Sequence, residues 1–88
     1  MANEHFVYML KCKDNTLYTG YTTDVSHRLK VHESGKGAKY TRGRGPFTLV
    51  YVEKLASKGE ALRQEIHIKK LSRKEKLALI ASYQRRDS

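Results

Sequence analysis

Residues 6–21 have the sequence FVYMLKCKDNTLYTGY. The first half, Phe6 to Cys12, is an apolar and aromatic run, and the second half, Thr16 to Tyr21, is rich in β-branched and aromatic residues. Both compositions favour strands. Asp14 and Asn15 favour a turn between them, because both tolerate left-handed backbone angles and hydrogen-bond to nearby backbone. The stretch therefore predicts a β-hairpin.

Two tyrosines, Tyr8 and Tyr18, lie ten positions apart on either side of this turn. Because side chains alternate between the faces of a strand, the tyrosines share a face only if even positions pair with even ones. An odd-length connection such as Asp14-Asn15-Thr16 gives that pairing, whereas a two-residue Asp14-Asn15 turn puts the tyrosines on opposite faces. On composition alone, packing in the core of a small domain is enough to explain why both tyrosines are present.

The rest of the chain predicts one more strand and three helices. The first helix runs to about Glu33, with N-cap candidates at residues 22–24. The strand covers Phe47 to Leu55; its apolar start indicates burial on both faces and an inner or central place in the sheet. Capping boxes at residues 57–60 and 72–75 predict two further helices, broken near residue 71.

These elements give the order β-β-α-β-α-α. We expect a single α/β (α+β) domain over residues 1–88, with a small, mostly antiparallel three-stranded sheet flanked by helices. The C-terminal helix covers about residues 73–84, and the polar tail 85–88 is frayed.

Charge gives the first functional indication. The chain has 18 Lys and Arg against 9 Asp and Glu, a net charge of +9, which attracts polyanions. Solubility or an acidic protein partner would explain the total equally well. The single cysteine, Cys12, allows no internal disulfide and argues against a tetrahedral zinc site. With no apolar stretch long enough for a bilayer and no signal peptide, we expect a cytoplasmic protein without membrane contact.

The segment from Ser34 to Pro46, SGKGAKYTRGRGP, is a basic loop without an acidic residue. We interpret it as a nucleic-acid grip, with cations for phosphates and a tyrosine that stacks on a base or sugar. The residues of this prediction are Lys36, Lys39, Tyr40, Arg42 and Arg44. The alternative is a solvated loop. A second basic cluster across the helix break is equally compatible with DNA contact and with an ordinary charged face; it contains Lys69, Lys70, Arg73, Lys74 and Lys76.

Two tripeptides, Phe6-Val7-Tyr8 and Tyr18-Thr19-Gly20, stand on the two predicted hairpin strands. With Arg28 in the first helix and Glu65 in a later one, their order and spacing resemble the GIY-YIG nuclease domain, over about residues 4–71. The resemblance is closest to its short stand-alone bacterial members. Phe6 and Val7 replace the family's Gly and Ile, and no Asn follows Asn15 where many members have one after the Glu.

The resemblance implies an endonuclease that hydrolyses DNA phosphodiesters with one Mg²⁺ or Mn²⁺ ion held by Glu65. Its catalytic residues would be Tyr8, Tyr18, Arg28 and His32, with Gly20 as a structural residue. Arg28 would hold the scissile phosphate through paired hydrogen bonds. Tyr8 would position or deprotonate the water, and Tyr18 would bind the water or the phosphate.

Each of these residues also has a structural interpretation. A phenol with a pKa near ~10 is a poor base unless Arg28 and the metal lower it. His32, one helical turn past Arg28, is either a proton acceptor or a surface histidine. Taken singly, Arg28 is a surface arginine and Glu65 the i, i+4 partner of Lys69.

The main alternative function is a nucleic-acid-binding module of the same fold with weak or no cleavage, and the third is a basic protein-interaction domain. DNA is the expected partner and RNA the alternative. Because the chain has no room for a separate recognition domain, specificity would come from DNA structure or from a protein partner. The sequence leaves the preferred substrate and the oligomeric state open.

Overall fold

The computed structural model describes residues 4–35 and 43–86. Its elements, in chain order, are β1 (His5–Lys11), β2 (Leu17–Thr22), α1 (Val25–Glu33), β3 (Thr48–Leu55), α2 (Lys58–Lys69) and α3 (Arg73–Arg86). This is the predicted order, although α3 extends past its predicted end at residue 84. In the two described ranges, no helix has the length and apolar character needed to cross a membrane.

The three strands form one antiparallel sheet in the order β2-β1-β3. β1 is therefore central and β3 is an edge strand, so the prediction of an inner third strand was wrong. The strand is nevertheless covered on both faces, as its apolar start predicts, because Tyr51 belongs to one core cluster and Val52 packs against the other. A β-bulge between the pairs Met9↔Tyr51 and Leu10↔Leu49 leaves Val50 unpaired. Because of the extra residue, Val50 and its neighbour Tyr51 are buried in the same core cluster.

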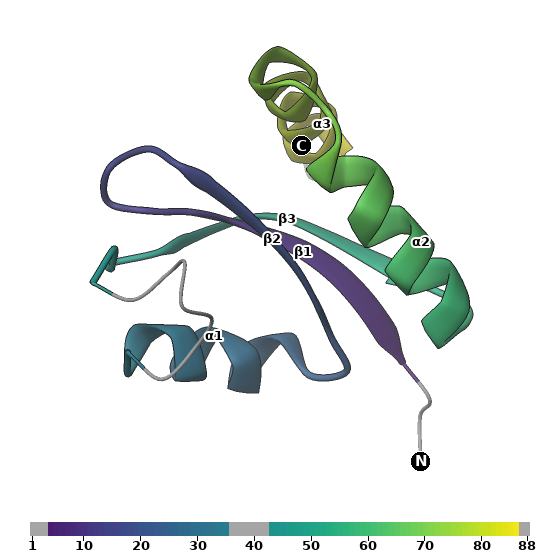
Figure 1. The fold of residues 1–88 in the computed structure, drawn as a ribbon, viewed down its shortest axis with the longest axis horizontal. Helices are drawn as coiled ribbons and strands as arrows, with labels where there is room; N and C mark the ends of the chain where they lie inside the picture. Colours follow the sequence, from purple (N-terminus) through teal and green to yellow (C-terminus); the bar gives the residue numbers. More distant parts are fainter. Residues whose placement is uncertain (1–3, 36–42, 87–88) are drawn as a thin grey trace.

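The sheet separates two hydrophobic clusters. Figure 1 shows α1 on one side of the sheet and α2 and α3 on the other. Odd-numbered β1 residues face α2 and α3, in a cluster of Val7, Met9, Val50, Tyr51, Ala61, Ile68 and Ile80. Even-numbered residues face α1, in a cluster of Tyr8, Leu10, Cys12 and Phe47 with Tyr18, Leu29 and Val52 packed against it. The candidate site is built on this second face.

Each helix begins at a side-chain cap. The Asp24 carboxylate accepts a hydrogen bond from the His27 backbone N–H at 3.0 Å and so starts α1. Both predicted N-cap serines are confirmed: the backbone N–H groups of Glu60 and Glu75 donate to the hydroxyls of Ser57 and Ser72 at 3.2 and 3.1 Å. Glu75 completes its capping box by accepting from the Ser72 N–H at 2.9 Å, whereas Glu60 accepts from the Ala56 N–H at 3.2 Å, one residue before the N-cap. Local sequence therefore determines where each helix starts.

The hairpin pairs Tyr8 with Gly20 and Leu10 with Tyr18, so even positions face even positions as the shared tyrosine face requires. Backbone hydrogen bonds from Cys12 to Thr16 and from Asn15 to Cys12, both 2.9 Å, close a three-residue connection over residues 13–15. This connection is odd in length but begins one residue earlier than Asp14-Asn15-Thr16. Asn15 has a φ of +68°, the left-handed conformation that ends such a turn.

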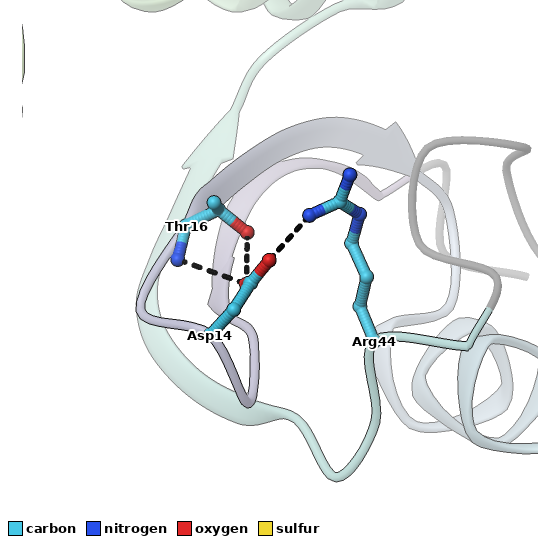
Figure 2. Close-up of polar contacts among 3 residues, drawn as sticks. All are labelled: Asp14, Thr16 and Arg44. Atoms are coloured by element: carbon cyan, nitrogen blue, oxygen red, sulfur yellow. Dashed lines mark hydrogen bonds and ion pairs between the residues drawn. The ribbon is translucent and has the colours of Figure 1, made fainter.

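Side chains and backbone tie this turn to the segment before β3 (Figure 2). Asp14 Oδ1 accepts hydrogen bonds from the Thr16 backbone N–H at 3.2 Å and from the Thr16 hydroxyl at 2.6 Å. Asp14 Oδ2 pairs with the Arg44 guanidinium, and the Lys13 N–H donates to the Arg44 carbonyl at 2.8 Å. The Thr16 hydrogen bonds, and to a lesser degree Arg44, hold the pKa of the Asp14 carboxyl below its usual range. The hairpin tip and the entry to β3 thus stabilise each other.

Candidate functional site

The centre of the candidate site is a hydrogen bond between the Tyr8 hydroxyl and His32 Nε2, 2.8 Å long and buried. The two side chains are 2% and 1% exposed, so the interpretation of His32 as a surface histidine was wrong. The His32 ring lies edge-on to Tyr18 and to Phe47, with centroid distances of 5.2 and 5.9 Å. Both predicted tyrosines therefore contact the same imidazole.

Burial sets the protonation of this pair. Desolvation raises the pKa of Tyr8 to about 12, although a hydrogen bond from Arg28 opposes the shift. Burial, and secondly the positive charge of Arg28, lower the pKa of His32. Near neutral pH, a protonated phenol therefore faces a neutral imidazole. In this state the phenol is the donor and Nε2 the acceptor, which places the imidazole proton on Nδ1.

Arg28 reaches the same cluster from α1. Its charge acts on both Tyr8 and His32. Its Nε is buried and has no hydrogen-bond partner. A buried donor without a partner is rare and calls for an explanation. A guanidinium that retains an unused donor beside a phenol can donate a hydrogen bond to a phosphate oxygen.

Glu65 belongs to α2, which covers the opposite face of the sheet, yet its charge acts on Tyr8. Its carboxylate is 17% exposed and pairs with Lys69 Nζ at 3.0 Å. Lys69 in turn lines a pocket of about 350 Å³ together with Tyr18 and Thr19 of β2. Because β2 is an edge strand, α2 can reach past it. The carboxylate is therefore close enough for its charge to act on Tyr8, and it also has the i, i+4 partner expected from the sequence.

The described residues contain no group of three or more His, Cys, Asp and Glu side chains that could hold a metal ion. Glu65 offers a partly buried carboxylate whose charge acts on Tyr8. Such a donor fits Mg²⁺, which keeps most of its water ligands and takes others from a bound phosphate. A site that requires a complete protein cage, as structural zinc does, does not fit.

Gly20 has a steric role that the sequence did not reveal. A Cβ atom at this position would lie 2.6 Å from the Tyr8 hydroxyl oxygen and 2.7 Å from Tyr8 Cζ. The Tyr8 ring therefore lies directly over the Gly20 backbone. Phe6, which replaces the glycine of the first tripeptide, pairs regularly with Thr22 and Lys54, so the replacement does not disturb the sheet.

The predicted nucleic-acid grip is only partly described. Lys36, Lys39, Tyr40 and Arg42 lie outside the described residues. Arg44 is described, and its guanidinium pairs with Asp14 at the hairpin tip. The second basic cluster divides in two: Lys69, Arg73 and Lys76 line pockets beside β2, whereas Lys70 and Lys74 do not.

Two residues of the site were missed by sequence reasoning. Phe47 packs against His32. Thr19, which is 4% exposed, has a buried hydroxyl with no hydrogen-bond partner. The position of Thr19 inside the second tripeptide was the one available signal, whereas nothing in the sequence connected Phe47 with the first helix.

Comparison with known proteins is consistent with this geometry. The GIY-YIG catalytic domain family matches residues 4–78. The UPF0213 protein OB0043 of Oceanobacillus iheyensis is 59% identical over 80 residues, which cover 91% of this chain and 93% of the relative. The UPF0213 protein NP_0776A of Natronomonas pharaonis is 54% identical over 81 residues, which cover 92% of this chain and 95% of the relative.

Two solution NMR structures are also similar. The UPF0213 protein BH0048 of Bacillus halodurans has 59% identity and a TM-score of 0.59, with 89% of this chain and 83% of that chain covered. The protein EF2693 of E. faecalis has 39% identity and a TM-score of 0.66, with 94% and 88% covered. The chain therefore belongs to the GIY-YIG family, a family with a nuclease-type fold, and its relatives are the small UPF0213 proteins.

Proposed function

We propose that the protein is a divalent-metal-dependent endonuclease that hydrolyses phosphodiester bonds in DNA. The observation that carries this proposal is the buried Tyr8–His32 hydrogen bond beside Arg28, in a chain of the GIY-YIG family. The net charge of +9 supports a polyanionic substrate.

Arg28 binds the scissile phosphate in this mechanism. Its guanidinium is held in the cluster by α1 and has an unused Nε donor. Donors that are fixed before the reaction stabilise the charge that develops on the phosphoryl oxygens. Tyr18, on the same face of the hairpin, positions the phosphate or the attacking water.

Tyr8 and His32 together accept the proton of the attacking water. A phenol with a pKa of about 12 is almost never ionised at neutral pH, so Tyr8 does not act as a free base. Its proton can move along the 2.8 Å hydrogen bond to His32 Nε2 as its oxygen accepts a proton from water. The water oxygen then bonds to phosphorus, one phosphorus–oxygen ester bond breaks, and the leaving oxygen takes up a solvent proton.

Glu65 would hold the divalent ion. The ion would supply positive charge to the phosphoryl oxygens and acidify bound water. Lys69, which is 3.0 Å from the carboxylate, neutralises Glu65 in the ion's absence.

The test is cleavage of linear, flapped and branched DNA with Mg²⁺ or Mn²⁺, and with a chelator as the negative control. We expect Tyr8→Phe, His32→Gln and Glu65→Gln each to lower the rate at least about 100-fold, the usual contribution of one positioned acid or base. Tyr21→Phe is the matched control, since it removes a similar 2.9 Å phenol–imidazole hydrogen bond, to His5, away from the cluster. Equal rates for Tyr8→Phe and Tyr21→Phe would remove Tyr8 from the mechanism.

The second candidate is a nucleic-acid-binding module of the same fold that cleaves weakly or not at all. The Glu65–Lys69 ion pair favours it, because the carboxylate proposed to hold the metal ion already has a cationic partner. Metal-independent DNA binding without cleavage of any DNA form would support this candidate over the endonuclease.

A further inference from the structure

Two adjoining pockets lie along the edge strand β2, next to the candidate site. One, of about 350 Å³, is lined by Leu17, Tyr18, Thr19, Lys69 and Lys76. The other, of about 200 Å³, is lined by Thr16, Leu17, Arg73 and Lys76. Lys76 is common to both. Strand β2 and the two helices α2 and α3 therefore enclose a groove whose charged lining residues are all cationic.

The cations of this groove differ in how they are neutralised. Lys69 pairs with Glu65 at 3.0 Å. Arg73 and Lys76 form no ion pair with any of residues 4–35 and 43–86. Lys76 is also partly buried where it lines the groove. The groove thus favours an anion at the Arg73 and Lys76 end.

Thr19 supplies an independent indication. It is 4% exposed, it lines the larger pocket, and its buried hydroxyl has no hydrogen-bond partner. A buried hydroxyl without a partner destabilises the free protein. The hydroxyl therefore has an unused hydrogen bond, and it belongs to a residue that lines the pocket together with Lys69 and Lys76. Hydrogen bonds to an ionised phosphate oxygen are among the stronger ones in proteins.

We propose that this groove binds a second backbone phosphate of the nucleic-acid strand, through Lys76, Arg73 and the Thr19 hydroxyl. The inference rests on the proposed function and extends it. Tyr18 connects the two sites, because its ring contacts His32 and the residue is also one of those that line the groove. A strand whose scissile phosphate lies at Arg28 continues over Tyr18 and across the β2 edge. Lys70 and Lys74 take no part in this contact.

The first experiment compares two substitutions with the same change of charge on the same helix. DNA binding is measured by fluorescence anisotropy in chelator over a range of salt concentrations. Each lost phosphate contact lowers the slope of log affinity against log salt by about 0.9 for duplex or about 0.7 for single strands. We expect Lys76→Gln to lower the slope by this amount and Lys74→Gln to leave it unchanged. Equal slopes for the two variants would overturn the groove as a specific contact.

The second experiment uses Thr19→Val, which removes the hydroxyl and keeps the shape. We expect a higher Tm, because an unsatisfied hydroxyl is lost, together with DNA binding that is about tenfold weaker. A merely structural threonine would leave binding unchanged, and that result would contradict the proposal.

Two further outcomes separate this inference from the proposed function. Wild-type protein that binds no DNA would overturn both. Wild-type protein that cleaves DNA, with Thr19→Val and Lys76→Gln cleaving and binding equally well, would overturn the groove alone. Inorganic phosphate is tested by itself: if it binds in a Thr19-dependent manner while DNA does not, the ligand is a free phosphate and the nucleic-acid proposal fails.

Discussion

Gly20→Ala should damage the candidate site by displacing Tyr8. The new Cβ would lie 2.6 Å from the Tyr8 hydroxyl oxygen and 2.7 Å from Cζ, about 1 Å inside ordinary van der Waals separation. Tyr8 is 2% exposed and hydrogen-bonded to His32, so its ring cannot simply swing into solvent. The ring must instead shift, which lengthens the 2.8 Å hydrogen bond to the imidazole.

Overpacking of this kind costs about 1–3 kcal/mol of unfolding free energy. For a domain of this size, each kcal/mol lowers Tm by about 4–8 °C. Thermal denaturation followed by circular dichroism measures the loss of stability, and NMR titration of the His32 ring reports the lengthened hydrogen bond. In Gly20→Ala, the rate of DNA cleavage should be lower wherever the His32 titration is changed.

Gly59→Ala is the matched control. Its Cβ would meet only Arg63 and Ser57 side-chain atoms, at 3.5 and 3.9 Å, in the first turn of α2. We expect it to raise stability by about 0.4–1 kcal/mol. In a protein that already carries Tyr8→Leu, Gly20→Ala should lower the free energy of unfolding by about 1 kcal/mol less than in the wild type, as expected for two residues in contact. Additive effects of the two substitutions, or an unchanged His32 titration in Gly20→Ala, would refute the proposed contact.

Three further predictions concern protonation and the turn. One of the six tyrosines, Tyr8, should titrate near pH 12 when tyrosinate absorbance is followed. Because the pKa of Tyr8 in the folded state exceeds 10.0, the stabilisation that Tyr8 provides should be lost as the pH rises from 10 towards 12. The Tyr8→Phe protein should not show this loss of stability. Folding lowers the pKa of His32 below 6.5, so at a pH just below 6.5 the protein should take up a proton when it unfolds. The Tm should therefore fall on acidification, and this fall should be smaller in His32→Gln. Asn15, at φ +68°, should accept Gly without loss of stability, whereas Val should cost at least about 1 kcal/mol in chemical denaturation.

Features that depend on neighbouring residues were predictable from the sequence. The N-cap serines of α2 and α3 lie three residues before the glutamates whose N–H groups they accept, so each cap forms as soon as its helix does. The hairpin likewise followed from its strand composition and its Asp-Asn turn. Only the position of the turn, one residue earlier than expected, depended on Asn15 taking the left-handed conformation.

Features that depend on tertiary contacts were not predictable. The apolar run of β3 correctly indicated burial on both faces but not the place of the strand at the edge of the sheet. The bulge at Val50 was not predictable either, because a bulge has no reliable signal in one sequence. His32 could be read as a surface residue because helical spacing alone does not reveal that Tyr8, Tyr18 and Phe47 enclose it. The place of Glu65 depends on α2 reaching past the edge strand, which follows from the strand order.

The register of the hairpin joins these local and distant features. The three-residue connection pairs Tyr8 with Gly20, and a different register would place a side chain under the Tyr8 ring. The same pairing puts Tyr18 on the Tyr8 face and leaves the neighbouring Thr19 on the opposite face, beside Lys69 and Lys76. A single turn conformation thus assigns adjacent residues of β2 to the candidate site and to the proposed phosphate groove. A nucleic-acid strand that crosses the β2 edge can therefore contact both.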